Sequence, residues 1–90
     1  MKFDYDHVKS MANQIKHGVS LEEAKGLWLV PNVQIEARMV DETRFMIIGK
    51  FRDKFYSCVF TMRSETIRLI SMRRSREREE KIYHEFIAQK

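Results

Sequence analysis

Cysteine, proline and glycine are scarce in this 90-residue chain, which contains one, one and three of them. The lone cysteine, Cys58, cannot form an internal disulfide. Because Cys58 falls in an apolar strand pattern, we expect a buried free thiol rather than a nucleophile. Linkers, repeats and low-complexity segments are also missing, and 43% of the residues are hydrophobic, which argues against disorder. We therefore expect one compact domain that spans residues 1–90.

The sequence has no long hydrophobic run. No apolar stretch approaches the roughly 20 residues that a membrane-spanning helix needs. The N-terminus, MKFDYDHVKS, is polar and charged from its second residue, which is not typical of a signal peptide. The simplest expectation is a cytoplasmic protein that does not associate with a membrane.

Motifs for metal chemistry and for a phosphate loop are missing as well. His7, His17 and His84 are dispersed along the chain, and neither an HExxH pattern nor a cysteine pair occurs. There is no glycine-rich phosphate loop, and Ser71 has no evident base partner that would make it a nucleophile. We expect no metal and no cofactor.

The first predicted helix lies near the N-terminus. Asp6 can cap it, and it runs to about His17 and ends at Gly18, which can adopt the left-handed conformation. Its predicted apolar face consists of Val8, Met11, Ala12 and Ile15. Phe3 and Tyr5 alternate ahead of this helix, as in a short strand or an extended arm.

A capping-box pattern, Ser20 with Glu23, predicts a second helix that runs to about Leu29 and stops before Pro31. After the proline, the hydrophobic period changes to two, which is typical of strands. Four strands are expected, over residues 33–38, 44–51, 55–62 and about 66–72. A loop over residues 39–43 and short turns at residues 52–53 and 63–65 would join them.

A final helix completes the expected fold. Ser75 can cap it from about Arg76, and its packing stripe consists of Ile82, Tyr83, Phe86 and Ile87. Consecutive strands with short links pair antiparallel. The expected class is therefore α+β, with two N-terminal helices, a four-stranded antiparallel β-meander and a C-terminal helix. We expect the helices to cover one face of the sheet.

Positive charge is concentrated in the last third of the chain. The net charge is +4, and residues 61–90 carry eight Lys/Arg against five Asp/Glu, whereas residues 1–60 carry nine against eight. Guanidinium groups fixed on a strand can bind a phosphate through bidentate hydrogen bonds. Taken singly, each arginine could be a solvated charge paired with Glu77, Glu79 or Glu80. As a group they favour an anion site within residues 61–78: Arg63, Arg68, Arg73, Arg74, Arg76 and Arg78.

The local roles of several residues stay open. Plain alternation would place Arg68 and Arg73 on opposite faces of the sheet, unless a bulge changes the facing of Arg73. Lys16 and His17 end the first helix, where the helix dipole favours positive charge, so capping explains them without a function. The alternative is that they neutralise phosphate and exchange protons. Tyr83 could pack in the core or present its hydroxyl to a phosphate or a base.

The opening segment FDYDHVKSMANQIKHGVSLEEA carries residues at a recognisable spacing: Phe3, Asp4, Tyr5, Asp6, Lys9, Asn13, Lys16, His17, Gly18, Val19, Ser20, Glu22, Glu23 and Ala24. At these positions the sequence resembles BrnT-type toxins of type II toxin–antitoxin modules. Residues 44–49, 59–63 and 67–73 resemble later segments of the family, and Tyr83 lies near its usual C-terminal tyrosine. Three positions depart from the family pattern, in packing or capping residues only: Leu21, Met72 and Ser75.

The resemblance implies a RelE-like microbial ribonuclease fold and a metal-independent endoribonuclease, which attacks the phosphodiester through the 2′-hydroxyl and inhibits translation and growth. It also implies neutralisation by a ribbon-helix-helix antitoxin of the BrnA type, in a heterotetramer. The complex would repress its own operon and contact operator DNA only through the antitoxin.

Site residues follow from the resemblance together with the charge pattern. The expected catalytic residues are Arg63, Arg68, Arg73, Lys16, His17 and Tyr83. Arg44 and Arg74 are expected to bind RNA. Arg76 and Arg78 are expected to be helix-surface charges or contacts to the antitoxin. Two non-catalytic alternatives remain: a basic nucleic-acid-binding module, or a domain whose arginines receive an acidic protein partner.

Overall fold

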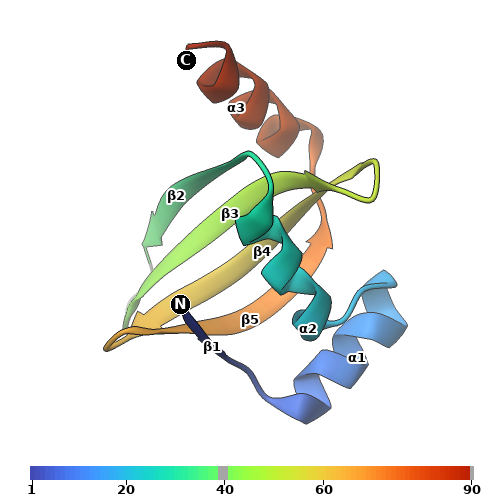
Figure 1. The fold of residues 1–90 in the computed structure, drawn as a ribbon, viewed down its shortest axis with the longest axis vertical. Coiled ribbons are helices and arrows are strands. Elements are labelled where there is room, and N and C mark those ends of the chain that lie inside the picture. Colours follow the sequence, from blue (N-terminus) through green and yellow to red (C-terminus); the bar gives the residue numbers. More distant parts are fainter. Residues whose placement is uncertain (39–40, 90) are drawn as a thin grey trace.

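The computed structural model describes residues 1–38 and 41–89 (Figure 1). The α+β class and the C-terminal helix are confirmed. Of the predicted loop 39–43, Met39 and Val40 lie outside the described residues, and Thr43 already belongs to a strand. In the described ranges the elements are β1 (Lys2–Asp4), α1 (His7–His17), α2 (Leu21–Ala24), the 3₁₀ helix η1 (Lys25–Leu29), β2 (Asn32–Arg38), β3 (Thr43–Phe51), β4 (Lys54–Arg63), β5 (Thr66–Arg74) and α3 (Glu77–Ala88).

Across the described residues the sheet has five strands, in the order β1-β5-β4-β3-β2, rather than the four predicted. The last four form the expected antiparallel meander. β1 pairs in parallel with β5, with Phe3 opposite Ile67, so the sheet is mixed. The segment at Phe3 therefore adopts the strand and not the extended arm. A strand of three residues is too short to display a period, which is why its pairing could not be read from the sequence.

Two tight turns set the register of β3, β4 and β5. Arg52 and Asp53 join β3 to β4 with φ angles of 53° and 66°, the left-handed conformation that two-residue hairpin turns prefer. Ser64, with φ of 58°, occupies the turn between β4 and β5. Both turns lie where the sequence predicts them.

The second helix starts as predicted but does not continue as an α-helix. Ser20 Oγ accepts a hydrogen bond from Glu23 N (3.1 Å), and Glu23 Oε1 accepts one from Ser20 N (2.9 Å), which completes the capping box. After Ala24 the chain continues as η1. A Cβ at Gly26 would lie 2.5 Å from the Phe51 ring. Glycine at this position therefore lets η1 approach the sheet closely.

The main core lies between one face of the sheet and the layer formed by α2 and η1 (Figure 1). Its most buried members include Leu21, Leu27, Ile47, Leu69 and Met72. Cys58 is fully buried among them, which confirms the predicted free thiol. Burial raises the pKa of Cys58 to about 12. The thiol is therefore protonated at neutral pH.

The predicted apolar face of α1 does not pack against the core, as an apolar helix face ordinarily would. Val8, Met11 and Ile15 of this face are 75%, 66% and 86% exposed. The side that is buried instead carries the polar residues Ser10 and Asn13.

The reason is that α1 packs against the edge of β5 rather than on an apolar face. Beyond the end of β1, Asn13 Nδ2 donates to Met72 O (2.8 Å) and Asn13 Oδ1 accepts from Met72 N (3.0 Å), as a neighbouring strand would. Asn13 also donates to Val19 O (2.7 Å), and Ser10 Oγ accepts from Leu21 N (3.0 Å). Buried backbone groups need hydrogen-bond partners, so the buried side of α1 is polar.

The C-terminal helix differs from the expectation in its cap and in its position. Ser75 does not cap it; Ser75 Oγ contacts Ser57 Oγ at 2.8 Å, while Glu79 Oε1 accepts from Arg76 N at 2.9 Å. Ser57 alternates with the core residues of β4, so α3 is anchored on the second face of the sheet. The helices therefore cover both faces instead of one. Within the predicted packing stripe, Ile82, Tyr83 and Ile87 are half-buried, and Phe86 is exposed.

Candidate functional site

A one-residue irregularity in β5 determines how the arginines face. Val59 pairs with Ser71, but the register shifts at the next pair, so Ile70 is an extra residue in β5. Beyond this bulge the alternation resumes in the opposite phase. Arg68 and Arg73 therefore lie on the same face of the sheet, and plain alternation, which separated them, is wrong here.

This second face, opposite the main core, carries arginines from three neighbouring strands. Thr61 and Ser57 of β4 are paired with Arg68 and Arg73 of β5. On β3, Arg44 precedes Phe45, which packs on the main core, and so Arg44 faces the other way. The arginines on the second face are Arg44 on β3, Arg63 on β4, and Arg68 and Arg73 on β5.

Three of these arginines line a small cavity of about 100 Å³. Lys9 of α1 adds a fourth cation, and Asp6 and Glu42 supply carboxylates, so positive charge is in excess. Arg44, Arg63 and Arg68 reach the cavity from three different strands. Strands hold side chains more rigidly than loops do, so this arrangement is suited to binding an anion such as phosphate.

The charges in this cavity are only partly paired. Arg68 Nη1 lies 2.7 Å from Asp4 Oδ2. Arg44 Nε lies 3.5 Å from Glu42 Oε1 but is buried without a hydrogen bond. Arg63 is exposed, and no ion pair or hydrogen bond to it is found in the part of the chain that the structure describes. The cavity therefore offers donors that an incoming anion could use.

Asp6 adds a fixed negative charge at the rim of the cavity. Its Oδ1 accepts a hydrogen bond from Lys9 N (3.0 Å), as the predicted N-cap of α1. That backbone hydrogen bond lowers the pKa of Asp6, with smaller contributions that include the charges of Lys9 and Arg68. The hydrogen bond thus favours the charged form of Asp6 beside the cations of the cavity.

A second shallow cavity adjoins the first between α1 and β5. Lys16 and His17 line it, and Lys9 and Ile70 line both cavities. The two hollows form one surface, which we call the basic groove; its basic residues are Lys9, Lys16, His17, Arg44, Arg63 and Arg68. Lys16 and His17 at the end of α1 therefore lie beside the strand that carries Arg68.

Lys9 was not among the expected site residues. Yet Lys9 and Lys16 are seven residues apart, which is about two turns, so they lie on the same side of α1. That spacing is the signal that could have identified Lys9 once Lys16 was considered.

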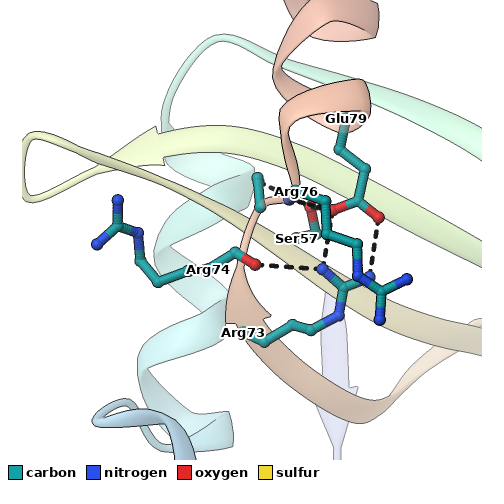
Figure 2. Close-up of polar contacts among 6 residues, drawn as sticks. Ser57, Arg73, Arg74, Arg76 and Glu79 are labelled. Atoms are coloured by element: carbon teal, nitrogen blue, oxygen red, sulfur yellow. Dashed lines mark hydrogen bonds and ion pairs between the residues drawn. The ribbon is translucent and has the colours of Figure 1, made fainter.

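Arg73 lies on the same face but does not line either cavity. Figure 2 shows its guanidinium group directed at the carboxylate of Glu79, with distances of 2.9 Å (Nη1 to Oε1) and 2.8 Å (Nη2 to Oε2). Glu79 Oε1 also accepts from Ser57 Oγ (2.9 Å) and from Arg76 N (2.9 Å). Glu79 is only 4% exposed. Arg73 thus ties the end of β5 to the first turn of α3.

Both members of this pair are held in their charged forms. Burial by itself raises the pKa of Glu79, but the hydrogen bonds from Arg73, Arg76 N and Ser57 outweigh burial and lower it to about 2. The hydrogen bond to Glu79 raises the pKa of Arg73. The positive charge of Arg73 is therefore balanced within the protein.

The remaining predicted site residues lie outside the groove. The Arg74 guanidinium sits 5.9 Å from the centre of the Tyr56 ring and points away from the Arg73–Glu79 pair (Figure 2). Arg76 and Arg78 are exposed near the start of α3. Tyr83 is half-buried, with its ring centre 5.0 Å from that of Phe55. The structure thus brings together Arg44, Arg63, Arg68, Lys16 and His17, and not the other expected residues.

Within residues 1–38 and 41–89, no three His, Cys, Asp or Glu side chains gather closely enough to hold a metal ion. In the same residues, no helix combines the length and the apolar character needed to cross a membrane.

Comparison with known proteins gave one informative match. A sequence model of the family described as "Ribonuclease toxin, BrnT, of type II toxin-antitoxin system" matches residues 5–79. A search of curated proteins found no match. The matched range contains every residue of the basic groove and also the Arg73–Glu79 pair, whereas Tyr83 lies beyond it.

Proposed function

The chain belongs to the BrnT family of ribonuclease toxins of type II toxin–antitoxin systems, and from this membership we propose that it is an endoribonuclease that binds its RNA along the basic groove. The observation that carries the proposal is the meeting of Arg44, Arg63 and Arg68 in one cavity beside Lys16 and His17. Cations fixed beside a phosphodiester stabilise the negative charge that develops on it during cleavage.

We propose that Arg63 and Arg68 bind the phosphate that is cleaved. Arg63 is free of ion pairs among the described residues, and Arg68 is held in place by Asp4. Arg44 Nε is a buried donor without an acceptor, and such a donor gains free energy when an anion supplies one. A phosphate oxygen in the cavity would meet this requirement.

The proposed reaction needs no metal. The 2′-hydroxyl loses its proton to a base, its oxygen bonds to phosphorus, and the bond from phosphorus to the 5′-oxygen breaks. The leaving 5′-oxygen takes up a proton, which gives a 2′,3′-cyclic phosphate and a 5′-hydroxyl. Lys16 and His17 are the proposed proton-transfer groups, because they lie next to the arginine cavity and an imidazole exchanges protons readily near neutral pH.

Arg73 and Tyr83 do not line the basic groove. Arg73 is paired with Glu79, and Tyr83 packs beside Phe55. A contact of either residue with phosphate stays a prediction. We assign Arg73 a positioning role, since it fixes the end of the strand that also carries Arg68. Arg74 stays a predicted contact to RNA outside the groove.

The type II family also implies a protein antitoxin as partner. As part of the same proposal, we expect a ribbon-helix-helix antitoxin of the BrnA type to neutralise the toxin in a heterotetramer that represses its own operon. We also expect a RelE-like fold relationship, action in the cytoplasm, and contacts from Arg76 and Arg78 to the antitoxin. The resemblance of the sequence to the family supports these points.

The test is cleavage of a defined RNA by the purified protein in the presence of EDTA. We expect the wild type to release fragments with 5′-hydroxyl ends, and Arg63→Ala to be at least about 100-fold slower, the order that loss of one transition-state contact costs. Arg78→Ala is the matched control, because Arg78 is also exposed but lies on α3, and it should cleave at the wild-type rate.

Two results would contradict the proposal. Salt-sensitive RNA binding without cleavage by the wild type would favour a non-catalytic RNA-binding module. Equal cleavage rates for wild type and Arg63→Ala would show that the basic groove does not take part in cleavage.

A further inference from the structure

The outer side of α1 presents a row of apolar side chains. Val8, Met11, Ala12 and Ile15 are spaced i, i+3, i+4 and i+7, so they lie on one side of the helix. All four are exposed, and the exposed fractions of Val8, Met11 and Ile15 are 75%, 66% and 86%. We call this row the α1 stripe.

Folding of the chain does not account for the stripe. The opposite side of α1 already forms hydrogen bonds with the backbone at the edge of β5, through Asn13, and at the start of α2, through Ser10. The main core contains no residue of the α1 stripe. A contiguous apolar row that the fold leaves uncovered is typical of a surface that binds another protein.

The stripe is continuous with the basic groove. Ala12 belongs to the stripe and also lines the second cavity, beside Lys9 and Lys16. The segment of α1 contains no acidic residue. The outer face of α1 is therefore apolar along its middle and positively charged on the side that turns toward β5.

We infer that the α1 stripe is the docking surface for an amphipathic helix of the protein antitoxin, with acidic residues along the edge that faces Lys9 and Lys16. This inference rests on the proposed function, which supplies the antitoxin. The spacing of the stripe is the spacing that a second helix can pack against. The lysines favour a partner with negative charge on one side only.

A second copy of this chain fits the surface less well. Docking of two α1 stripes would bring Lys9 and Lys16 of one copy near the same residues of the other, and like charges at an interface oppose association. RNA suits the basic groove but not an apolar row. An acidic amphipathic helix matches both parts.

The size of the surface indicates how binding would inhibit the toxin. Specific interfaces bury about 800 Å² on each partner, which is more than four side chains on one helix provide. The partner must therefore extend beyond the stripe, and the adjoining surface with complementary charge is the basic groove. Antitoxin and RNA are then expected to compete for Lys9 and Lys16.

The test compares antitoxin binding by two variants. The probe is the protein encoded beside the gene for this chain, used once its co-expression restores growth to cells that express the toxin. We expect Met11→Glu/Ile15→Glu to bind this protein at least about 100-fold more weakly than the wild type, while cleaving RNA at the wild-type rate. Leu29→Glu is the matched control, because Leu29 on η1 is as exposed as Ile15 (86%), and it should bind normally.

The outcomes separate the inference from the function on which it rests. Wild-type affinity in Met11→Glu/Ile15→Glu would overturn the docking surface while leaving the ribonuclease proposal intact. A wild-type dimer that the double variant disrupts, with unchanged antitoxin binding, would assign the stripe to a second copy and overturn the inference as well. Absence of both growth arrest and RNA cleavage in the wild type would instead overturn the proposed function.

Discussion

At the scale of single residues, Asn13 shows how one side chain can determine the placement of a helix. Its amide makes both hydrogen bonds that a strand would make to Met72 and a third to Val19. It is 8% exposed, so water cannot easily replace these bonds. Asn13 thus links the first helix, the loop after it and the last strand.

Truncation of Asn13 should therefore destabilise the protein strongly. We expect Asn13→Ala to lower the free energy of unfolding by about 3 kcal/mol, because buried backbone groups of Met72 and Val19 lose their partners. Chemical denaturation measures this change. Gln14→Ala, at the exposed neighbouring position, should change stability by less than about 0.5 kcal/mol. Similar values for the two variants would contradict this role of Asn13.

At the scale of elements, the sequence predicts well where helices and strands begin and end. It predicts less well which side of each element packs against the rest of the fold. The caps of α1 at Asp6 and Gly18 and the turn at residues 52–53 are local features, and the structure has them where predicted. The facing of α1 depends on the unpaired edge of β5, which no local pattern reveals. The facing of Arg73 depends on the bulge at Ile70 in the same way.

For the candidate site, too, the sequence predicts the residues better than their contacts. The types of residue and the segments that carry them follow from the charge pattern and the family resemblance, and the structure brings five of the expected residues together. The pairing of Arg73 with Glu79 is one of the alternatives that the charge pattern leaves open. The burial of Glu79 could not be predicted, because it requires α3 to turn onto the second face of the sheet. Lys9 is not among the predicted residues, although its seven-residue spacing from Lys16 places both lysines on one side of α1.

The attachment of α3 should depend on pH through Glu79. The pKa of Glu79 is about 2 in the folded protein, below its ordinary value of 4.5. The pair therefore stabilises the fold fully above about pH 4.5, and this contribution disappears as the pH falls toward about 2. We expect a loss of about 3 kcal/mol of unfolding free energy over this window.

Glu79→Gln provides the comparison for this prediction. Its unfolding free energy at pH 7 should be lower than that of the wild type, and the difference should shrink between pH 4.5 and 2. Glu85→Gln, at an exposed position of α3, should follow the wild-type curve. Parallel curves for wild type and Glu79→Gln would show that the ion pair does not anchor the helix.

At the scale of the whole molecule, the two faces of the sheet carry different kinds of side chain. One face forms the main core with α2 and η1 (Figure 1). The other face carries the arginines and the start of α3. α1 lies at the edge between them and contributes to the basic groove on one side and to the α1 stripe on the other. The proposed RNA-binding surface and the proposed antitoxin-binding surface thus meet at one helix.

The most direct test of ribonuclease action through the groove is mapping of RNA 5′-ends in cells after brief induction. We expect new 5′-hydroxyl ends and growth arrest with the wild type and with Arg78→Ala, and neither with Arg63→Ala. Intact RNA in cells that express the wild type, or the same new ends with Arg63→Ala, would contradict cleavage through the basic groove.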